Sequence, residues 1–220
     1  MNPAPAHHHV RVLANRRVCE GTIELEIERG AFRFVAGQEI ILHGEVAEED
    51  RTYSIASGEH DATMKLLVRI IPDGAVSTRL ARMRPRDSVR FSGPTGSFTL
   101  RDPATPCWFI ATGTGIAPLV SFIRTQPALR PVVLHGVRHE SELYARALIE
   151  SSSERYEPCI SRPGAGAGRR VTDALRTMTP DPAAHYYLCG GNPMIREVRA
   201  LLLAGGVAAD RIFGEAYYFW

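Results

Sequence analysis

A glycine-rich segment, Ala111–Pro118 (ATGTGIAP), directly follows an apolar run and opens an apolar helical pattern. Gly113 and Gly115 permit close approach to the backbone, and the helix beyond them would offer unpaired N–H groups and its positive dipole end to a phosphate. Pro118 suits an early helical turn, although it stands where a G-x-G-x-x-G motif has its third glycine. The segment predicts a phosphate-binding loop, and an ordinary glycine-rich turn is an equally good alternative.

The segment Arg51–Ser54 (RTYS) combines three useful groups within four residues. An arginine can hold a phosphate through paired hydrogen bonds, a tyrosine can lie against an aromatic ring system, and a serine hydroxyl can bond to a ring nitrogen. Arg51 and Tyr53 stand two positions apart, so on a strand they would face the same side. Taken alone, the segment is better explained as a strand with a surface arginine and a core tyrosine.

Two further segments, Gly74–Thr78 (GAVST) and Cys189–Met194 (CGGNPM), stand where an expected element begins or ends. The hydroxyl groups of the first could bind a pyrophosphate together with local N–H groups, or could simply cap a helix. Cys189 ends an expected strand, and ligands of open parallel sheets bind outside the carboxyl ends of their strands. We therefore expect Cys189 at the same rim as Gly113, with a buried structural cysteine as the alternative.

The first hundred residues show short, partly alternating apolar runs between turn signals, a pattern typical of strands. Only 76–83 favours a helix. This pattern predicts an antiparallel β-barrel or sandwich. The expected strands are 9–18, 22–30, 38–44, 51–57, 64–71 and 87–94.

From about Pro103 the pattern changes to strands alternating with helices, which implies a mostly parallel sheet with right-handed crossovers. The boundary should fall within 101–106, giving domains 1–101 and 102–220. The expected strands are 107–112, 131–137, 156–161, 185–190 and 211–220, and the expected helices are 116–125, 141–153, 171–178 and 192–206.

The composition of the 220 residues narrows the class of protein. A net charge of +2 disfavours a dedicated nucleic-acid binder, and no apolar run reaches the length of a membrane span. No secretory signal stands at the start, so we expect a cytoplasmic protein with reduced thiols. His7–His9 could bind a metal, but a frayed polar terminus is favoured. The cysteines stand far apart and predict no zinc or iron–sulfur site: Cys19, Cys107, Cys159 and Cys189.

These segments, in this order, resemble the ferredoxin–NADP(+) reductase superfamily. The resemblance runs from about Phe34 to the end of the chain and includes Gly93–Gly96 (GPTG). Within the superfamily it is closest to bacterial ferredoxin or flavodoxin reductases, a subgroup that His135–Arg138 (HGVR) and the aromatic ending Phe219-Trp220 also favour. The resemblance implies an FAD-binding β-barrel followed by an NADP(H)-binding α/β domain.

The resemblance also implies roles for particular residues. Arg51 and the Ser77–Thr78 turn would hold the FAD pyrophosphate, Tyr53 would pack on the isoalloxazine ring, and Ser54 would lie near its N5 atom. Cys189, Glu215 and Trp220 would act at the reacting rings together with Ser54. The implied FAD contacts are Arg51, Thr52, Tyr53, Ser54, Leu67, Val68, Arg69, Gly74, Val76, Ser77, Thr78 and Trp220. The implied nicotinamide-nucleotide contacts are Thr112, Gly113, Thr114, Gly115, Pro118, Arg138, Ser161, Arg162, Arg170, Cys189, Gly190 and Met194.

The implied function is electron transfer between NADPH and ferredoxin or flavodoxin, by a monomer that meets its carrier transiently. The flavin would supply the redox chemistry while the protein aligns two rings and excludes water. An NAD(P)H:flavin reductase, an oxygenase reductase component and a non-catalytic relay subunit are the alternatives. NADPH is expected over NADH because Ser161, Arg162, Arg170 and Arg138 suit a 2′-phosphate, with a solvated loop as the alternative.

Overall fold

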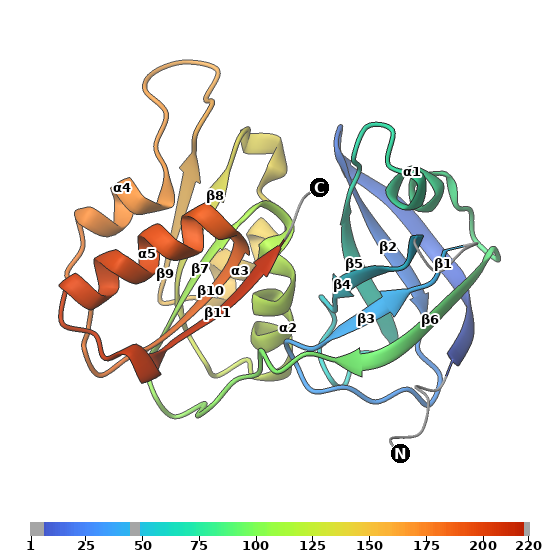
Figure 1. The fold of residues 1–220 in the computed structure, drawn as a ribbon, viewed down its shortest axis with the longest axis horizontal. Coiled ribbons are helices and arrows are strands. Elements are labelled where there is room, and N and C mark those ends of the chain that lie inside the picture. Colours follow the sequence, from blue (N-terminus) through green and yellow to red (C-terminus); the bar gives the residue numbers. More distant parts are fainter. Residues whose placement is uncertain (1–6, 45–48, 218–220) are drawn as a thin grey trace. The chain divides into compact units, whose positions relative to one another are not determined.

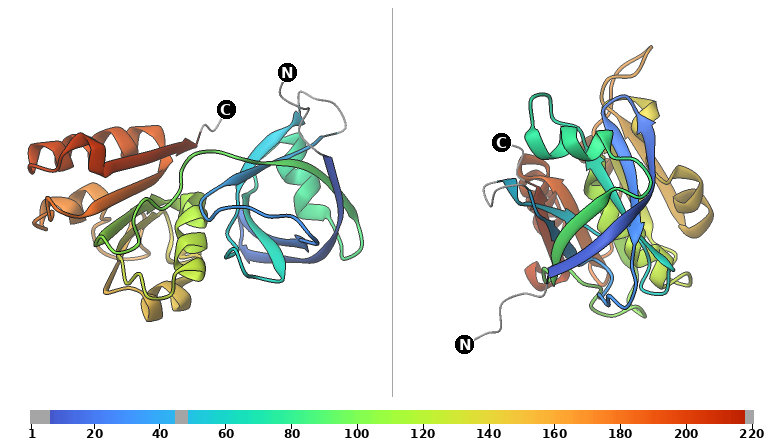
Figure 2. Two further views of the ribbon diagram at one scale, coloured as in Figure 1. Left: turned by 90° about the horizontal axis from the view of Figure 1, so that it is seen from below. Right: turned by 90° about the vertical axis from the view of Figure 1, so that its right-hand side faces the viewer.

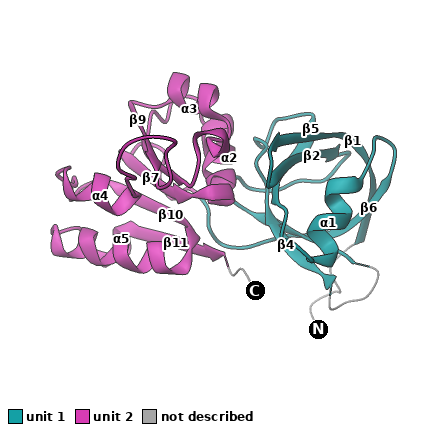
Figure 3. Cartoon of the chain, turned by 90° about the horizontal axis from the view of Figure 1, so that it is seen from above, with its two compact units in different colours: residues 1–99 teal, residues 100–220 magenta. Residues whose placement is uncertain are grey.

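The computed structural model describes residues 7–44 and 49–217 of the chain. They belong to two compact units, Met1–Thr99 and Leu100–Trp220 (Figure 3). We call these unit 1 and unit 2 and describe each by itself.

Unit 1 is an antiparallel β-barrel, as the sequence predicts. Its strands follow the order β4-β3-β6-β1-β2-β5, and an antiparallel bridge between Ile55 and Leu66 brings the end of β4 to β5 and closes the sheet (Figures 1 and 2). Its helix is α1, Ala75–Arg82. Its strands are β1 (His7–Cys19), β2 (Thr22–Glu28), β3 (Glu39–Leu42), β4 (Arg51–Ser54), β5 (Thr63–Arg69) and β6 (Ser88–Thr95).

The barrel interior is filled by one apolar cluster from alternating strand positions. Val76 and Leu80 of α1 join this cluster, so the helix packs one face against the barrel. Asn15 of β1 fastens the other end of α1, because its Nδ2 donates to the carbonyls of Leu80 at 2.9 Å and Met83 at 2.8 Å. The Leu80 carbonyl also accepts from the Met83 N–H at 3.2 Å, so Asn15 reinforces the end of the helix.

The expectation of a frayed histidine terminus is wrong for His7–His9. These residues form the first part of β1 and pair with Ser92, Phe91 and Arg90 of β6. The ring of His8 stacks on Phe91 at a centroid distance of 4.9 Å. Strand pairing and aromatic packing order this stretch, neither of which can be read from a run of identical polar residues.

Unit 2 is a five-stranded, fully parallel sheet in the order β11-β10-β7-β8-β9. Helices α4 and α5 cover one face, and α2 and α3 lie on the other (Figure 3). Its strands are β7 (Cys107–Thr112), β8 (Val132–Val137), β9 (Arg155–Ile160), β10 (His185–Gly191) and β11 (Ile212–Tyr217). Its helices are α2 (Ala117–Thr125), α3 (Arg146–Ser152), α4 (Val171–Arg176) and α5 (Asn192–Ala204).

The expected helix over 141–153 is wrong in its first half. A short 3-10 turn, Glu140–Glu142, comes first, and α3 begins only at Arg146. Ala145 between them has a left-handed backbone with φ of 53°, which interrupts the helix. In the described part of the chain, no helix has both the length and the apolar character needed to cross a bilayer.

Candidate functional site

Strand β4 presents Arg51 and Thr52 to solvent, whereas Tyr53 is half-buried and Ser54 is buried. Tyr53 packs against the barrel cluster, and burial raises its pKa to about 12 even though the nearby charges of Arg51 and Arg79 oppose the rise. The phenol is therefore neutral at physiological pH. The strand thus combines the surface arginine and the packed tyrosine that its pattern predicts, with two cations close to the tyrosine.

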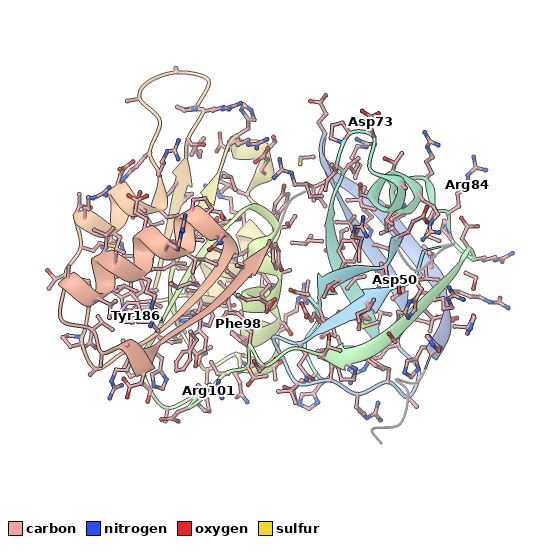
Figure 4. The ribbon with its side chains drawn as sticks, viewed as in Figure 1. Asp50, Asp73, Arg84, Phe98, Arg101 and Tyr186 are labelled. Atoms are coloured by element: carbon pink, nitrogen blue, oxygen red, sulfur yellow. The ribbon has the colours of Figure 1, made fainter. Side chains whose placement is uncertain are left out.

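A cavity of about 340 Å³ lies at the start of α1 in unit 1. Its lining residues on the helix follow the spacing i, i+3, i+4, i+7, which is one helical face. Asp73 precedes this face at the tip of the loop (Figure 4). The lining residues are Asp73, Gly74, Ala75, Thr78, Arg79 and Arg82.

Gly74 and Thr78 line this cavity as expected for a phosphate turn, but Val76 and Ser77 do not. Val76 belongs to the barrel core, and the buried Ser77 hydroxyl accepts a hydrogen bond from the Ile71 N–H at 3.0 Å. A side chain at Gly74 would meet Ile71 O and Ser77 Oγ at 3.0 Å. No side chain caps α1 at Gly74, so the capping alternative is wrong.

Sequence reasoning missed Arg79 and Arg82. The Nη2 atom of Arg79 donates to the carbonyl of His43 at 3.1 Å, while its buried Nε atom has no hydrogen-bond partner within unit 1's described residues. A buried guanidinium N–H without a partner is costly, and the guanidinium charge of Arg79 at the cavity would attract an anion. The available signal was the spacing of both arginines from Ala75, i+4 and i+7 along the helix.

Strand β5 holds the expected Leu67–Arg69. Leu67 and Val68 are buried, and Val68 is part of the barrel core. Arg69 is half-buried at the end of the strand. Of these three side chains, Val68 therefore serves the barrel interior.

In unit 2 the glycine-rich segment follows β7 as a 3-10 turn, Gly113–Ile116, and continues directly into α2 with Pro118 in its first turn. Gly113 has a left-handed backbone with φ of 55°, a conformation that glycine adopts without the cost of a side chain. Sequence reasoning predicted this strand–turn–helix arrangement. It brings the first N–H groups of the turn to the carboxyl end of the sheet.

The two glycine-containing turns interlock at this edge. A side chain on Gly115 would lie 2.5 Å from the Cys189 carbonyl oxygen, and one on Gly190 would lie 2.2 Å from Thr112 Oγ1. The same Oγ1 accepts a hydrogen bond from the Gly191 N–H at 3.2 Å. Cys189 therefore lies at the same edge of the sheet as the glycine loop, while its side chain is buried, as the structural alternative predicts.

Cys189 itself is fully buried, and it pairs in register with Ala111 of β7 and Glu215 of β11. Glu215 is half-buried beside it, and Met194 of α5 is half-buried against the apolar core of unit 2. Trp220 lies outside the described residues.

The expected arginines gather at the carboxyl ends of β8 and β9. The Arg162 N–H donates to the Arg138 carbonyl at 2.8 Å, and both side chains are exposed, as is that of Arg170. The Ser161 hydroxyl donates to the Val137 carbonyl at 3.1 Å, so it holds the two strand ends together.

The neighbouring Arg169 behaves differently from Arg170. Its guanidinium pairs with Glu157 and donates to the hydroxyl of Thr177 at 3.2 Å. The solvated-loop alternative is therefore wrong for Arg169, which is fixed by a salt bridge.

Sequence reasoning also passed over the packing of His135 on β8. Its side chain is completely buried, and its Nε2 atom lies 3.1 Å from the Gly113 carbonyl oxygen. The only sequence signal is a histidine within the apolar strand pattern of residues 131–137 (PVVLHGV).

Within residues 7–44 and 49–217, no group of three or more histidine, cysteine, aspartate or glutamate side chains is arranged to hold a metal ion.

Comparison with known families gives two matches in the order of the two units. The oxidoreductase FAD-binding domain matches residues 9–100, and the oxidoreductase NAD-binding domain matches residues 109–200.

The chain is 35% identical to ferredoxin–NADP reductase B of Sorangium cellulosum, over 94% of this chain and 96% of that protein. It is 28% identical to the toluate 1,2-dioxygenase electron transfer component of Pseudomonas putida, over 92% of this chain but 65% of that protein. Among solved structures, a ferredoxin NADP+ reductase from Neisseria gonorrhoeae with bound FAD and NADP has the same fold. Its TM-score is 0.85 and its identity 23%, covering 96% of this chain and 99% of that one.

Proposed function

The chain belongs to the ferredoxin–NADP(+) reductase superfamily of FAD- and NAD(P)-binding oxidoreductases, and we propose that it transfers electrons between NADPH and a ferredoxin or flavodoxin through FAD. The observation that carries this proposal is the 35% identity to a ferredoxin–NADP reductase over almost the whole of both chains. The match to the toluate dioxygenase component is weaker at 28%, and the chain spans 65% of that protein.

Unit 1 offers groups that suit FAD. The cavity at α1 is lined by Thr78, Arg79 and Arg82, and the two guanidinium charges favour an anionic occupant such as a pyrophosphate. We assign Arg51 and these residues to the pyrophosphate and Tyr53 to the flavin ring. We also assign the backbone of Leu67–Arg69 to the FAD site. The proposed FAD-binding domain comprises residues 1–101. When bound, FAD converts two-electron hydride chemistry into one-electron transfer.

Unit 2 offers groups that suit the coenzyme, and we assign the NADP(H) domain to 102–220. The turn after Thr112 has N–H groups without intrahelical partners, which suit a pyrophosphate. Gly115 and Gly190 let the two turns pack against each other, because a side chain at either position would clash with Cys189 or Thr112. Thr114, Pro118 and Met194 belong to the same proposed nucleotide site.

Ser54, Cys189 and Glu215 are our candidates for tuning the reaction. Hydride transfer itself requires no acid or base side chain, so these groups would orient the rings and keep water away. Trp220, outside the described residues, keeps its proposed role of covering the flavin ring until the nicotinamide displaces it.

The arginines at the ends of β8 and β9 support a preference for NADPH over NADH. The side chains of Arg138, Arg162 and Arg170 are exposed, and the backbones of the first two are hydrogen-bonded to each other. A 2′-phosphate needs forked donors and positive charge, both of which guanidinium groups supply. Ser161 contributes by fixing the two strand ends.

The proposal is tested by assaying the purified protein with NADPH and with both artificial and protein electron acceptors. The protein should be yellow, should retain FAD through gel filtration and should reduce ferricyanide. It should also reduce cytochrome c only when a ferredoxin or flavodoxin is added. A colourless protein that takes up no flavin would refute the proposal.

The same experiment separates the alternatives. Loss of flavin during gel filtration, with turnover of added free flavin, would favour an NAD(P)H:flavin reductase. Reduction of an oxygenase's own iron–sulfur carrier in preference to other carriers would favour an oxygenase component. A failure to reduce ferricyanide with FAD bound would favour a relay subunit.

We further propose that the protein acts as a monomer, meets its carrier transiently and works in the cytoplasm. None of the four cysteines is joined in a disulfide, and three of them are buried, which suits a reducing compartment. Light scattering at assay concentration, alone and with ferredoxin, tests the first two statements.

A further inference from the structure

A buried histidine lies directly beneath the glycine loop of unit 2. His135 pairs in register with Ala111 on β7, and its side chain has no exposed surface. Its Nε2 atom lies 3.1 Å from the carbonyl oxygen of Gly113, the first residue of the 3-10 turn in that loop. A carbonyl oxygen can only accept, so Nε2 carries the hydrogen and donates it.

The second nitrogen of the ring has a partner that favours the same tautomer. The hydroxyl of Tyr156, on β9, lies 3.5 Å from His135 Nδ1 and can donate to it only when Nδ1 carries no hydrogen. Burial lowers the pKa of His135 to about 4, so the ring stays neutral at physiological pH. The ring is therefore a fixed, uncharged donor aimed at the loop.

This hydrogen bond sets the direction of one peptide group. In a trans peptide the C=O and the following N–H point in opposite directions. Because the Gly113 carbonyl points to the His135 ring, the N–H of Thr114 points away from that ring. That N–H belongs to the first turn of a helix, where N–H groups have no intrahelical partner and bind phosphates.

Other residues of the loop are held by contacts with β10, whereas the Gly113–Thr114 peptide is held by His135. Gly115 is confined by the Cys189 carbonyl, and Thr112 Oγ1 is bonded to the Gly191 N–H. Gly113 has no atom within 4 Å of the place where a side chain would stand. A glycine rotates easily, so the hydrogen bond from His135 restrains the Gly113–Thr114 peptide.

We propose that His135 is a positioning residue for the coenzyme, which holds the Gly113–Thr114 peptide so that its N–H faces the pyrophosphate of NAD(P)H. The inference rests on the proposed assignment of the Thr112–Pro118 loop to the nucleotide. It concerns the pyrophosphate, which NADPH and NADH share. The 2′-phosphate is assigned separately, to Arg138, Arg162 and Arg170 beyond the ends of β8 and β9.

The test compares variants of the FAD-loaded protein by calorimetry with NADP+, NAD+ and adenosine 2′-monophosphate. His135→Leu removes the donor, whereas in His135→Gln the side-chain amide can donate to the same carbonyl. His185→Leu is the matched control, because it makes the same change at the amino end of β10. Tyr156→Phe removes only the hydroxyl above Nδ1 and serves if His135→Leu does not fold.

His135→Leu should weaken the binding of NADP+ and of NAD+ by the same factor, about tenfold for one lost hydrogen bond. Adenosine 2′-monophosphate, which has no pyrophosphate, should bind unchanged. His135→Gln and His185→Leu should stay within about twofold of the parent. In turnover, His135→Leu should raise the KM for NADPH with little change in kcat. Tyr156→Phe should shift both dinucleotides in the same direction by a smaller factor.

Three results would overturn the inference: unchanged NADP+ affinity in His135→Leu and Tyr156→Phe, equal weakening of adenosine 2′-monophosphate, or no restoration by His135→Gln. Failure of the parent protein to bind NADP+ at all would instead refute the proposed function on which the inference rests.

Discussion

The interlocked turns of unit 2 make Gly115→Ala a sharp perturbation. The added methyl group would lie 2.5 Å from the Cys189 carbonyl oxygen, about 0.9 Å short of the 3.4 Å at which ordinary contact begins. It would also lie 2.8 Å from the Gly190 Cα, so the glycine turn and strand β10 must separate. Overpacking of this kind costs roughly 1–3 kcal/mol. We expect a loss of unfolding free energy of about 2 kcal/mol or more and a weaker affinity for NADP+.

Urea unfolding followed by tryptophan fluorescence measures this loss. Both tryptophans, Trp108 and Trp220, belong to unit 2, so the signal reports that unit. Gly164→Ala is the control, because that glycine has no atom within 4 Å and no positive φ. Gly113→Ala should cost only the left-handed backbone, roughly 1–2 kcal/mol. If Gly115→Ala unfolds at the same urea concentration as Gly164→Ala, the interlocking of the two turns is not a tight contact.

Three further predictions follow from other residues. Arg79→Met should weaken FAD binding by roughly 1.5–3 kcal/mol, the contribution of a charged hydrogen bond, in a flavin fluorescence titration. Arg84→Met, at a residue outside the cavity, should leave FAD binding unchanged. Equal FAD affinities of the two variants would show that Arg79 does not contact FAD. His135 has a folded-state pKa of about 4 against 6.5 for an unperturbed histidine, so the unfolded chain takes up its proton first as the pH falls. The free energy of unfolding should therefore be unaffected above pH 6.5 and fall by about 3 kcal/mol towards pH 4. Urea unfolding of His135→Gln should lack this part of the decline. An identical pH dependence in that variant would contradict the low pKa of His135. The double variant Arg162→Ala/Arg170→Ala should lose most of its preference for NADPH over NADH in kcat/KM, and an unchanged ratio would show that the 2′-phosphate binds elsewhere.

Local patterns in the sequence were enough to predict most elements of both units. The strands of unit 1 and the strand–helix alternation of unit 2 follow from apolar periodicity, which depends only on neighbours along the chain. The glycine turn after β7 was also predictable. Gly113 and Gly115 stand between an apolar strand pattern and an apolar helix pattern, where glycines indicate a tight turn of the backbone. The irregular stretch around Ala145 was not, since nothing in an alanine signals a left-handed backbone.

The sequence by itself therefore determined the two architectures, the family resemblance and the segments that carry chemistry. Only the tertiary structure decided which side chains of those segments face a ligand and which hold the fold. Ser77 was expected at a pyrophosphate, but its hydroxyl closes a loop onto Ile71, while Arg79 lines the cavity. His135 lies 22 residues from Gly113 along the chain, and parallel pairing of β7 and β8 brings the two into hydrogen-bond contact. Contacts of this kind depend on strand register and on burial, which are properties of the packed chain rather than of any short stretch of sequence.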